Sequence, residues 1–292
     1  MVGSGKELFK KLTPRISIGS GPESDFNIGF DWKDIIRHSD EILNLPEVIA
    51  VRKKIQFVVC LDEFQHLASF STYDSLEKKI RASWQKHKQV TYCLYGSKRH
   101  MMNEIFNNPS KPFYRFGDII FLQKISTKEW IRFIVDGFKR TGKYISETNA
   151  ELIPQFMKNH PWYVQQLSHY TWQNTDKAAD KIEIMNALEE LIVTNSPLYE
   201  KEIESLSTTQ VNLLKAVVSK ETQFTSTSVM NDYRLGTPHN VSKNKSTLIN
   251  NDIIHKDAGY FEFLDPAFEL WFSKHFLDKN YLVKFSEIIK NQ

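Results

Sequence analysis

One stretch decides the fold, residues 57–67, which reads Phe-Val-Val-Cys-Leu-Asp-Glu-Phe-Gln-His-Leu. Five apolar residues, Phe57 to Leu61, run without a break into two adjacent acids, Asp62 and Glu63. A short continuous apolar run is typical of a strand that is buried on both faces, as in a parallel sheet. The stretch therefore predicts an α/β fold, with both acids at the carboxyl end of a strand, where open α/β sheets bind their ligands.

The acid pair has two interpretations. Two carboxylates at the end of a buried strand are costly unless a positive group meets them. A magnesium ion that carries a nucleotide is one such group: Asp62 would then bind Mg²⁺, and Glu63 would polarise the attacking water. The alternative is an ordinary strand that ends in a solvated Asp-Glu turn, and the short pattern fits both.

The composition limits the class of protein. The chain has 292 residues, of which 41% are hydrophobic and 25% charged, as expected for a globular protein of two or three domains. The net charge of +3 does not by itself imply nucleic acid. No apolar run approaches the ~18 residues that span a bilayer, and the start has no apolar signal region, so we expect a cytoplasmic protein without membrane contact. The two cysteines, Cys60 and Cys93, lie in apolar runs and are predicted to be reduced core residues.

Strands and helices alternate after the first stretch. A helix is expected over residues 74–87, a second buried strand over 90–95, a helix over 98–106 and a third strand over 118–122. Strand–helix–strand–helix order indicates a parallel α/β unit. We therefore assign residues 1–124 to an α/β core, of which only part of the parallel sheet is present.

The rest of the chain predicts two further domains. From Ser126 the apolar period becomes helical, and about four helices follow, so residues 125–200 form an all-α section. Residues 201–292 contain three helices, then a hairpin signal over 253–264, then an aromatic helix. Three helices followed by a hairpin is the order of a winged helix.

Five segments together resemble the archaeal-type P-loop ATPase family, which is related to the AAA+ and STAND NTPases. The likeness covers nearly the whole chain, and its specificity comes from the order of the segments, since each motif is weak alone. The resemblance implies ATP and Mg²⁺ as cofactors and a helical lid over the nucleotide. The segments are Leu-Asp-Glu-Phe-Gln at 61–65, Leu-Tyr-Gly-Ser at 94–97, Pro-Phe-Tyr-Arg-Phe at 112–116, His-Pro-Trp-Tyr-Val-Gln-Gln-Leu at 160–167 and Tyr-Phe-Glu-Phe-Leu-Asp-Pro-Ala-Phe-Glu-Leu-Trp-Phe at 260–272.

The resemblance gives roles to four residues of the core. Asp62 resembles the Walker B acid that binds Mg²⁺, and Glu63 the acid that activates water. Ser97 stands where the sensor-1 residue lies, near the γ-phosphate; it could equally be the N-cap of helix 98–106. Arg115 resembles an arginine that stabilises phosphoryl charge. Its alternative is a salt bridge or a stacked position in an aromatic cluster.

Two residues of the helical section would contact the nucleotide. His160 and Pro161 resemble the Gly-x-Pro motif of STAND proteins, although Asn159 stands where glycine is expected. The alternative for Pro161 is the first turn of a helix, which proline favours.

The Walker A motif, Gly-x-x-x-x-Gly-Lys-Ser/Thr, is absent from the sequence. Residues 3–7, Gly-Ser-Gly-Lys-Glu, place a carboxylate where the motif needs a hydroxyl. Residues 142–144, Gly-Lys-Tyr, do not match the motif either, because Tyr144 stands where it needs Ser or Thr. We therefore expect that the front of the ATPase domain is missing, through a shortened sequence, a misplaced start or a real loss, and that this chain hydrolyses ATP poorly or not at all.

The winged helix could bind DNA or a protein partner. Its third helix is short and polar and could enter a major groove, and a lysine of the wing could reach a phosphate. Two functions therefore remain: an ATPase-type molecular switch, in which nucleotide binds between core and lid, or a non-catalytic DNA-binding or scaffold protein with a remnant core. The sequence is compatible with an oligomer. The residues expected at nucleic acid are Ser242, Lys243, Asn244, Lys245 and Lys256.

Overall fold

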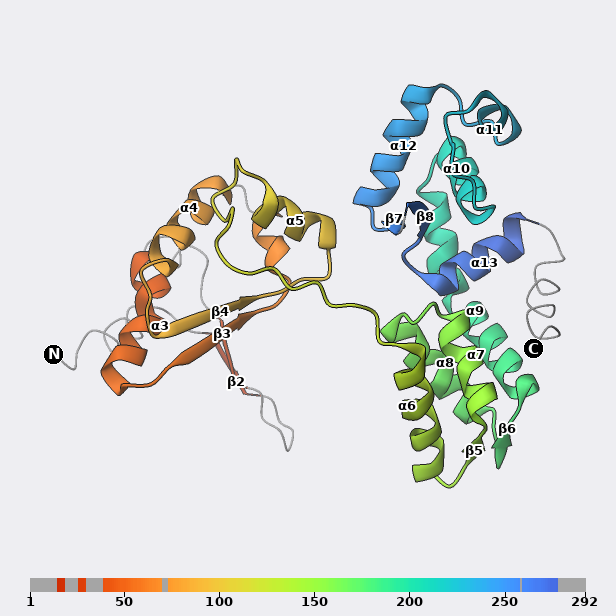
Figure 1. Cartoon of the computed structure of the whole chain (residues 1–292), viewed down its shortest axis with the longest axis horizontal. Coiled ribbons are helices and arrows are strands. Elements are labelled where there is room, and N and C mark those ends of the chain that lie inside the picture. Colours follow the sequence, from red (N-terminus) through yellow and green to blue (C-terminus); the bar gives the residue numbers. More distant parts are fainter. Residues whose placement is uncertain (1–14, 19–25, 30–38, 70–72, 258, 278–292) are drawn as a thin grey trace. The chain divides into compact units, whose positions relative to one another are not determined.

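The computed structural model describes residues 15–18, 26–29, 39–69, 73–257 and 259–277 (Figure 1). The chain divides into two compact units, Met1–Ile120 and Phe121–Gln292, each of which is described by itself. None of the helices in the described ranges is both long and apolar enough to cross a bilayer.

The first unit is built on two parallel strands. Strand β3 (Phe57–Leu61) pairs with β4 (Val90–Leu94) in parallel, with Phe57 opposite Val90 and Leu61 opposite Leu94. The crossover between them contains a 3₁₀ turn and helix α4, as parallel strands require. Its other elements are β1 (Arg15–Ile18) and β2 (Phe26–Gly29), which are antiparallel, α3 (Ser39–Lys53), the 3₁₀ turn η1 (Phe64–Ser69), α4 (Tyr73–Trp84) and α5 (Arg99–Asn107).

Only one face of the β3–β4 pair is covered by the described residues. Figure 1 shows α4 and α5 on one side of the pair, and there an aromatic cluster packs against it, with Trp84 stacked on Tyr92 at 4.0 Å between ring centroids. Positions on the other face are open, and Val58 is 67% exposed. The aromatic cluster consists of Phe64, Trp84, Phe106, Phe113 and Phe116.

Three predictions for this unit are therefore wrong. Strand β3 alternates between half-buried and exposed residues, so it is not buried on both faces. Cys60 and Cys93 are free and exposed, because they occupy the open face. Residues 118–122 form no strand: they pair with no strand of the described ranges, and Ile120 and Leu122 are 82% and 92% exposed.

The second unit begins with the four helices that the sequence predicted. They are α6 (Thr127–Arg140), α7 (Glu147–Phe156), α8 (Pro161–Gln173) and α9 (Lys181–Glu204), with two short parallel strands, β5 (Tyr144–Ile145) and β6 (Ala178–Ala179), between them. Helix α9 begins at a capping box, in which Asp180 accepts from the backbone and Glu183 reaches back to the Asp180 N–H. It then continues through residue 200 into the final section.

That final section has the predicted order of three helices and a hairpin. The two strands of the hairpin pair antiparallel, with Ile254 opposite Phe263. One continuous hydrophobic core of this unit extends from Trp130 in α6 to Phe272 in the last helix. The elements are α10 (Thr208–Val218), α11 (Thr227–Asp232), α12 (Pro238–Asn250), β7 (Ile254–Asp257), β8 (Tyr260–Phe263) and α13 (Pro266–Phe276).

Candidate functional site

The carboxyl ends of β3 and β4 bring three of the predicted site residues together. The parallel ladder continues past both strands, since the Tyr95 N–H donates to the Leu61 carbonyl at 3.1 Å. This contact fixes the register in which Asp62 and Glu63 leave β3 beside the turn that carries Ser97. The Ser97 Oγ donates to Glu63 Oε2 at 3.0 Å.

Glu63 is held by a second donor that sequence reasoning missed. The Gln65 side-chain amide also donates to Glu63 Oε2. The hydrogen bonds from Gln65 and then from Ser97 lower the Glu63 pKa below its usual value, so the carboxylate is ionised at neutral pH. Glu63 has a φ of 49°, and its N–H donates to Asp62 Oδ1 at 2.8 Å.

Gln65 itself is fully buried, and the end of its side chain lies against Gly96. A Cβ at position 96 would overlap the Gln65 amide, so any larger residue there would force that amide to shift. The glycine before Ser97 therefore leaves room for Gln65 in the position from which it reaches Glu63. A Gln two residues after an acid and a Gly before a Ser were the only signals of this arrangement in the sequence.

Ser97 is not the cap of the following helix. The N-cap of α5 is Lys98, and that cap has no side-chain hydrogen bond. The hydroxyl of Ser97 is instead used for Glu63, as a site residue at the end of a strand would use it.

Arg115, the fourth predicted residue of the core, lies beside the aromatic cluster, with its side chain over the neighbouring Tyr114. Its φ is 53°, its N–H donates to the Phe106 carbonyl at 3.4 Å, and its guanidinium carbon lies 5.1 Å from the centroid of the Tyr114 ring. The guanidinium is exposed and stacked.

The acid pair fits one part of a magnesium nucleotide, the metal ion, and not the other. Asp62 is exposed, and carboxylate oxygens are ligands that Mg²⁺ accepts, usually with several waters retained. The described ranges contain no group of three or more His, Cys, Asp or Glu side chains that could hold a metal by itself. The sequence also lacks the Gly-rich Lys-Ser/Thr loop that binds phosphates. The residues present therefore fit a hydrated metal ion, but they do not provide a cradle for the triphosphate.

His160 and Pro161 belong to the second unit, where Pro161 starts α8 and His160 is its N-cap without a side-chain cap bond. Burial lowers the pKa of His160, whose ring packs on Tyr163 at 5.0 Å between centroids. Asn159 has a φ of 57°, a left-handed conformation that asparagine tolerates better than most residues. This conformation explains how Asn159 can stand where a glycine was expected.

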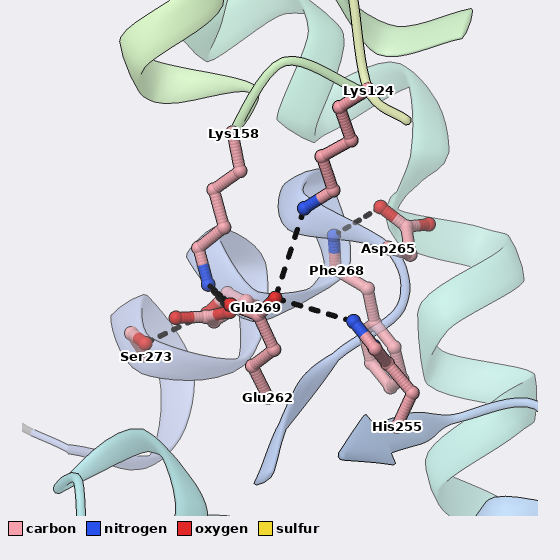
Figure 2. A network of polar contacts seen from close by, with 8 residues as sticks. All are labelled: Lys124, Lys158, His255, Glu262, Asp265, Phe268, Glu269 and Ser273. Carbon is pink, nitrogen blue, oxygen red and sulfur yellow. Dashed lines mark hydrogen bonds and ion pairs between the residues drawn. The ribbon is translucent and has the colours of Figure 1, made fainter. Parts of the chain in front are cut away.

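Beside this helix start lies a cluster of charges that the sequence did not reveal (Figure 2). The carboxylate oxygens of Glu262 in β8 lie 3.2 Å from Lys158 Nζ, 3.3 Å from His255 Nε2 and 3.8 Å from Lys124 Nζ. The Lys158 ammonium also pairs with the carboxylate of Glu269 in α13. The bond from His255, followed by the lysine charges, lowers the pKa of Glu262 to about 2. We call these five residues the Glu262 cluster.

The five residues expected at nucleic acid have different environments. Ser242 and Lys243 are exposed on α12, on one stripe with His239 and Ser246, and Lys256 is exposed on β7. Asn244 instead donates to Thr209 Oγ1 of α10 at 3.1 Å.

Lys245 lies on the side of α12 toward the hairpin. Its ammonium nitrogen lies 5.2 Å from the centroid of the Phe261 ring and 5.9 Å from that of Phe224. It borders a cavity of about 540 Å³ that Lys256 also lines. The other residues that line this cavity are Thr222, Gln223, Phe224, Thr225, Ser226, Gly259 and Phe261.

Comparison with known proteins supports this fold. A family model described as "Probable winged helix domain" matches residues 197–274. The Walker-type ATPase PABY2304 of Pyrococcus abyssi superposes with a TM-score of 0.61 at 17% identity, over 83% of this chain and 68% of that one. The RuvB Holliday junction branch migration motor of Thermotoga maritima gives a TM-score of only 0.41 at 14% identity, over 74% and 70% of the two chains. No curated protein matches the sequence.

These findings establish the fold. The chain combines an α/β core like that of P-loop ATPases, a set of helices and a winged helix, as the sequence predicted. The superposition with a TM-score of 0.61 supports the architecture. An identity of 17% is too low to assign an activity.

Proposed function

We propose that this chain is a molecular switch of the AAA+/STAND type, in which Asp62, Glu63 and Ser97 face a magnesium nucleotide. The observation that carries the proposal is the 3.0 Å hydrogen bond from Ser97 Oγ to Glu63 Oε2. It joins the ends of two neighbouring parallel strands, the edge at which open α/β sheets bind ligands. The roles follow the resemblance: Asp62 for the metal, Glu63 for water, and Ser97 and Arg115 for phosphate.

The same proposal includes slow or absent turnover of ATP. Catalysis of phosphoryl transfer depends on positioning and on charge stabilisation around the phosphates. A chain without a Walker A loop lacks the backbone N–H groups and the lysine that supply both. Glu63 is in place and ionised, but the phosphate that it would serve is held weakly.

Titration of the chain with a fluorescent ATP analogue, with and without Mg²⁺, tests the switch. We expect weak binding that needs Mg²⁺ and that is lost in Asp62→Asn, while Asp118→Asn, an exposed acid outside the site, binds like the wild type. Absence of any Mg²⁺-dependent binding would refute the nucleotide role. Robust ATP turnover that Glu63→Gln abolishes would refute the claim of slow hydrolysis.

A second function, nucleic-acid binding by the winged helix, is favoured by the exposed polar stripe of α12 and by the exposed Lys256 of β7. Lys243 and Lys256 are both exposed, whereas Lys245 covers two aromatic rings. Exposed lysines that neutralise phosphates make binding salt-dependent. Retention on duplex DNA should therefore fall in Lys243→Glu/Lys256→Glu and not in Lys128→Glu/Lys177→Glu. The second pair carries the same charge change at exposed positions of the helical section before the winged helix. Unchanged retention in both variants would leave the winged helix as a protein-interaction module.

A further inference from the structure

The two cysteines of the chain stand directly opposite each other on β3 and β4. In the parallel register Cys60 pairs with Cys93, and both thiols are free and exposed. Registered residues of neighbouring strands leave the sheet on the same face. Their Cα atoms are separated by about the strand spacing, ~4.8 Å, which lies inside the ~4.4–6.8 Å range that a disulfide spans.

The surroundings of the pair keep it accessible within the described ranges. Val58, Thr91 and both cysteines occupy the exposed positions of the alternating pattern, on the face opposite the aromatic cluster. The Tyr95 side chain, 46% exposed, marks the end of the same face.

We propose that Cys60 and Cys93 form a dithiol site that is closed reversibly to a disulfide by a low-molecular-weight disulfide such as oxidised glutathione. One protein thiolate attacks the reagent, a mixed disulfide forms, and one glutathione leaves as a thiol. The neighbouring thiolate then attacks the protein sulfur of the mixed disulfide and releases the second glutathione. The protein loses two electrons and two protons, and one oxidised glutathione becomes two reduced ones.

The site lies next to the candidate nucleotide edge but is independent of its function. Cys60 precedes Asp62 by two residues, and the bond would tie together the two strands whose ends carry Glu63 and Ser97. The inference depends on register and exposure alone, so it stands whether or not the chain binds nucleotide.

The test is oxidation of the reduced full chain with oxidised glutathione, followed by alkylation of free thiols and mass spectrometry. We expect the wild type to lose two protons, to carry no glutathione and to yield one peptide pair that joins Cys60 to Cys93. Cys93→Ser should instead stop at a mixed disulfide with one glutathione. Phenylarsine oxide, which bridges two neighbouring thiols, should bind one per chain in the wild type and dissociate readily from Cys93→Ser.

A matched control separates register from mere proximity. In Cys93→Ser/Thr91→Cys the second thiol stays on the same face of β4 but moves ~6.6 Å along the strand, beyond the reach of a disulfide in the folded state. This variant should accumulate glutathione adducts and close at least tenfold more slowly than the wild type. Closure at the wild-type rate, or a wild type that collects two glutathiones or reacts only in urea, would overturn the proposal.

Discussion

At the scale of single residues, Glu63 is the side chain whose state the structure defines most closely. Two donors converge on one of its oxygens, while its backbone adopts a left-handed conformation that is unusual outside glycine and asparagine. Such strain persists where the surrounding structure holds a residue in place, and it is found most often at functional sites. The contacts of Gln65 and Ser97 therefore fix both the direction and the charge of this carboxylate.

Removal of one donor should move the Glu63 pKa upward. Both hydrogen bonds favour the ionised form and lower its pKa, so Ser97→Ala should raise the pKa toward the ordinary value, and Gln65→Leu should raise it further because its bond is the larger cause. The shift can be measured from the side-chain carboxyl carbon by NMR across a pH series. Ser97→Thr keeps a hydroxyl donor and should titrate like the wild type. An unchanged pKa in Gln65→Leu would contradict the arrangement.

At the scale of elements, the Glu262 cluster ties together parts of the second unit that are distant in sequence. Lys158 follows α7, His255 and Glu262 lie on β7 and β8, and Glu269 lies on α13, 111 residues after Lys158. Burial of Lys158 would disfavour its charge, but the two carboxylates keep its pKa raised above the usual value. The cluster is a polar connection between the helices of the first half of this unit and the winged helix.

Replacement of Glu262 by glutamine should destabilise this unit in a pH-dependent way. The Glu262 pKa is about 2 in the folded chain, below its ordinary value of 4.5, so the stabilisation is fully present above about pH 5 and is lost as the pH falls from about 4.5 to 2. At pH 7 we expect Glu262→Gln to lower the free energy of unfolding by about 1.5–3 kcal/mol, the usual range for a hydrogen bond to a charged group. Urea unfolding at pH 7, 5 and 3 measures the difference, which should be similar at pH 7 and pH 5 and smaller at pH 3.

The control for this prediction is another acid of the same unit. Glu189 pairs with Lys274, but its side chain is 45% exposed, against 18% for Glu262. Glu189→Gln should therefore cost less than about 1 kcal/mol. Equal losses in the two variants, or a Glu262→Gln loss that persists unchanged at pH 3, would show that the carboxylate charge of Glu262 does not stabilise the fold.

At the scale of the whole molecule, the order of elements could be predicted from local patterns. The apolar run of β3, the helical periods after Ser126 and the hairpin after α12 each depend on residues close in sequence, and the structure has all three. Burial depends on distant segments, so the five apolar residues of β3 could not show that only one of its faces is covered. Gln65 and Lys158 were missed for the same reason, because their roles are set by Gly96 and by Glu262 and Glu269.

The two units should also differ in stability, because each has its own hydrophobic core. Among the described residues, the core of the first unit is a small cluster around Phe64, Trp84 and Phe113, on one face of the β3–β4 pair. The core of the second unit is continuous from α6 to α13 and has many more fully buried side chains. Small units bury a smaller fraction of their surface and are correspondingly marginal. We therefore expect the first unit to unfold at the lower urea concentration.

Hydrogen exchange followed by mass spectrometry along a urea series can test this without a mutation. Peptides from β3, α4 and β4 should lose protection together, at a lower urea midpoint than peptides from α9 and α13, because global opening of each unit sets the exchange of its core amides. Chymotrypsin should cut first between the units, after Phe121 or Leu122, since Leu122 is 92% exposed. Coincident midpoints for α4 and α9 would mean that the chain unfolds as one cooperative body, and the first unit would then draw its stability from the second.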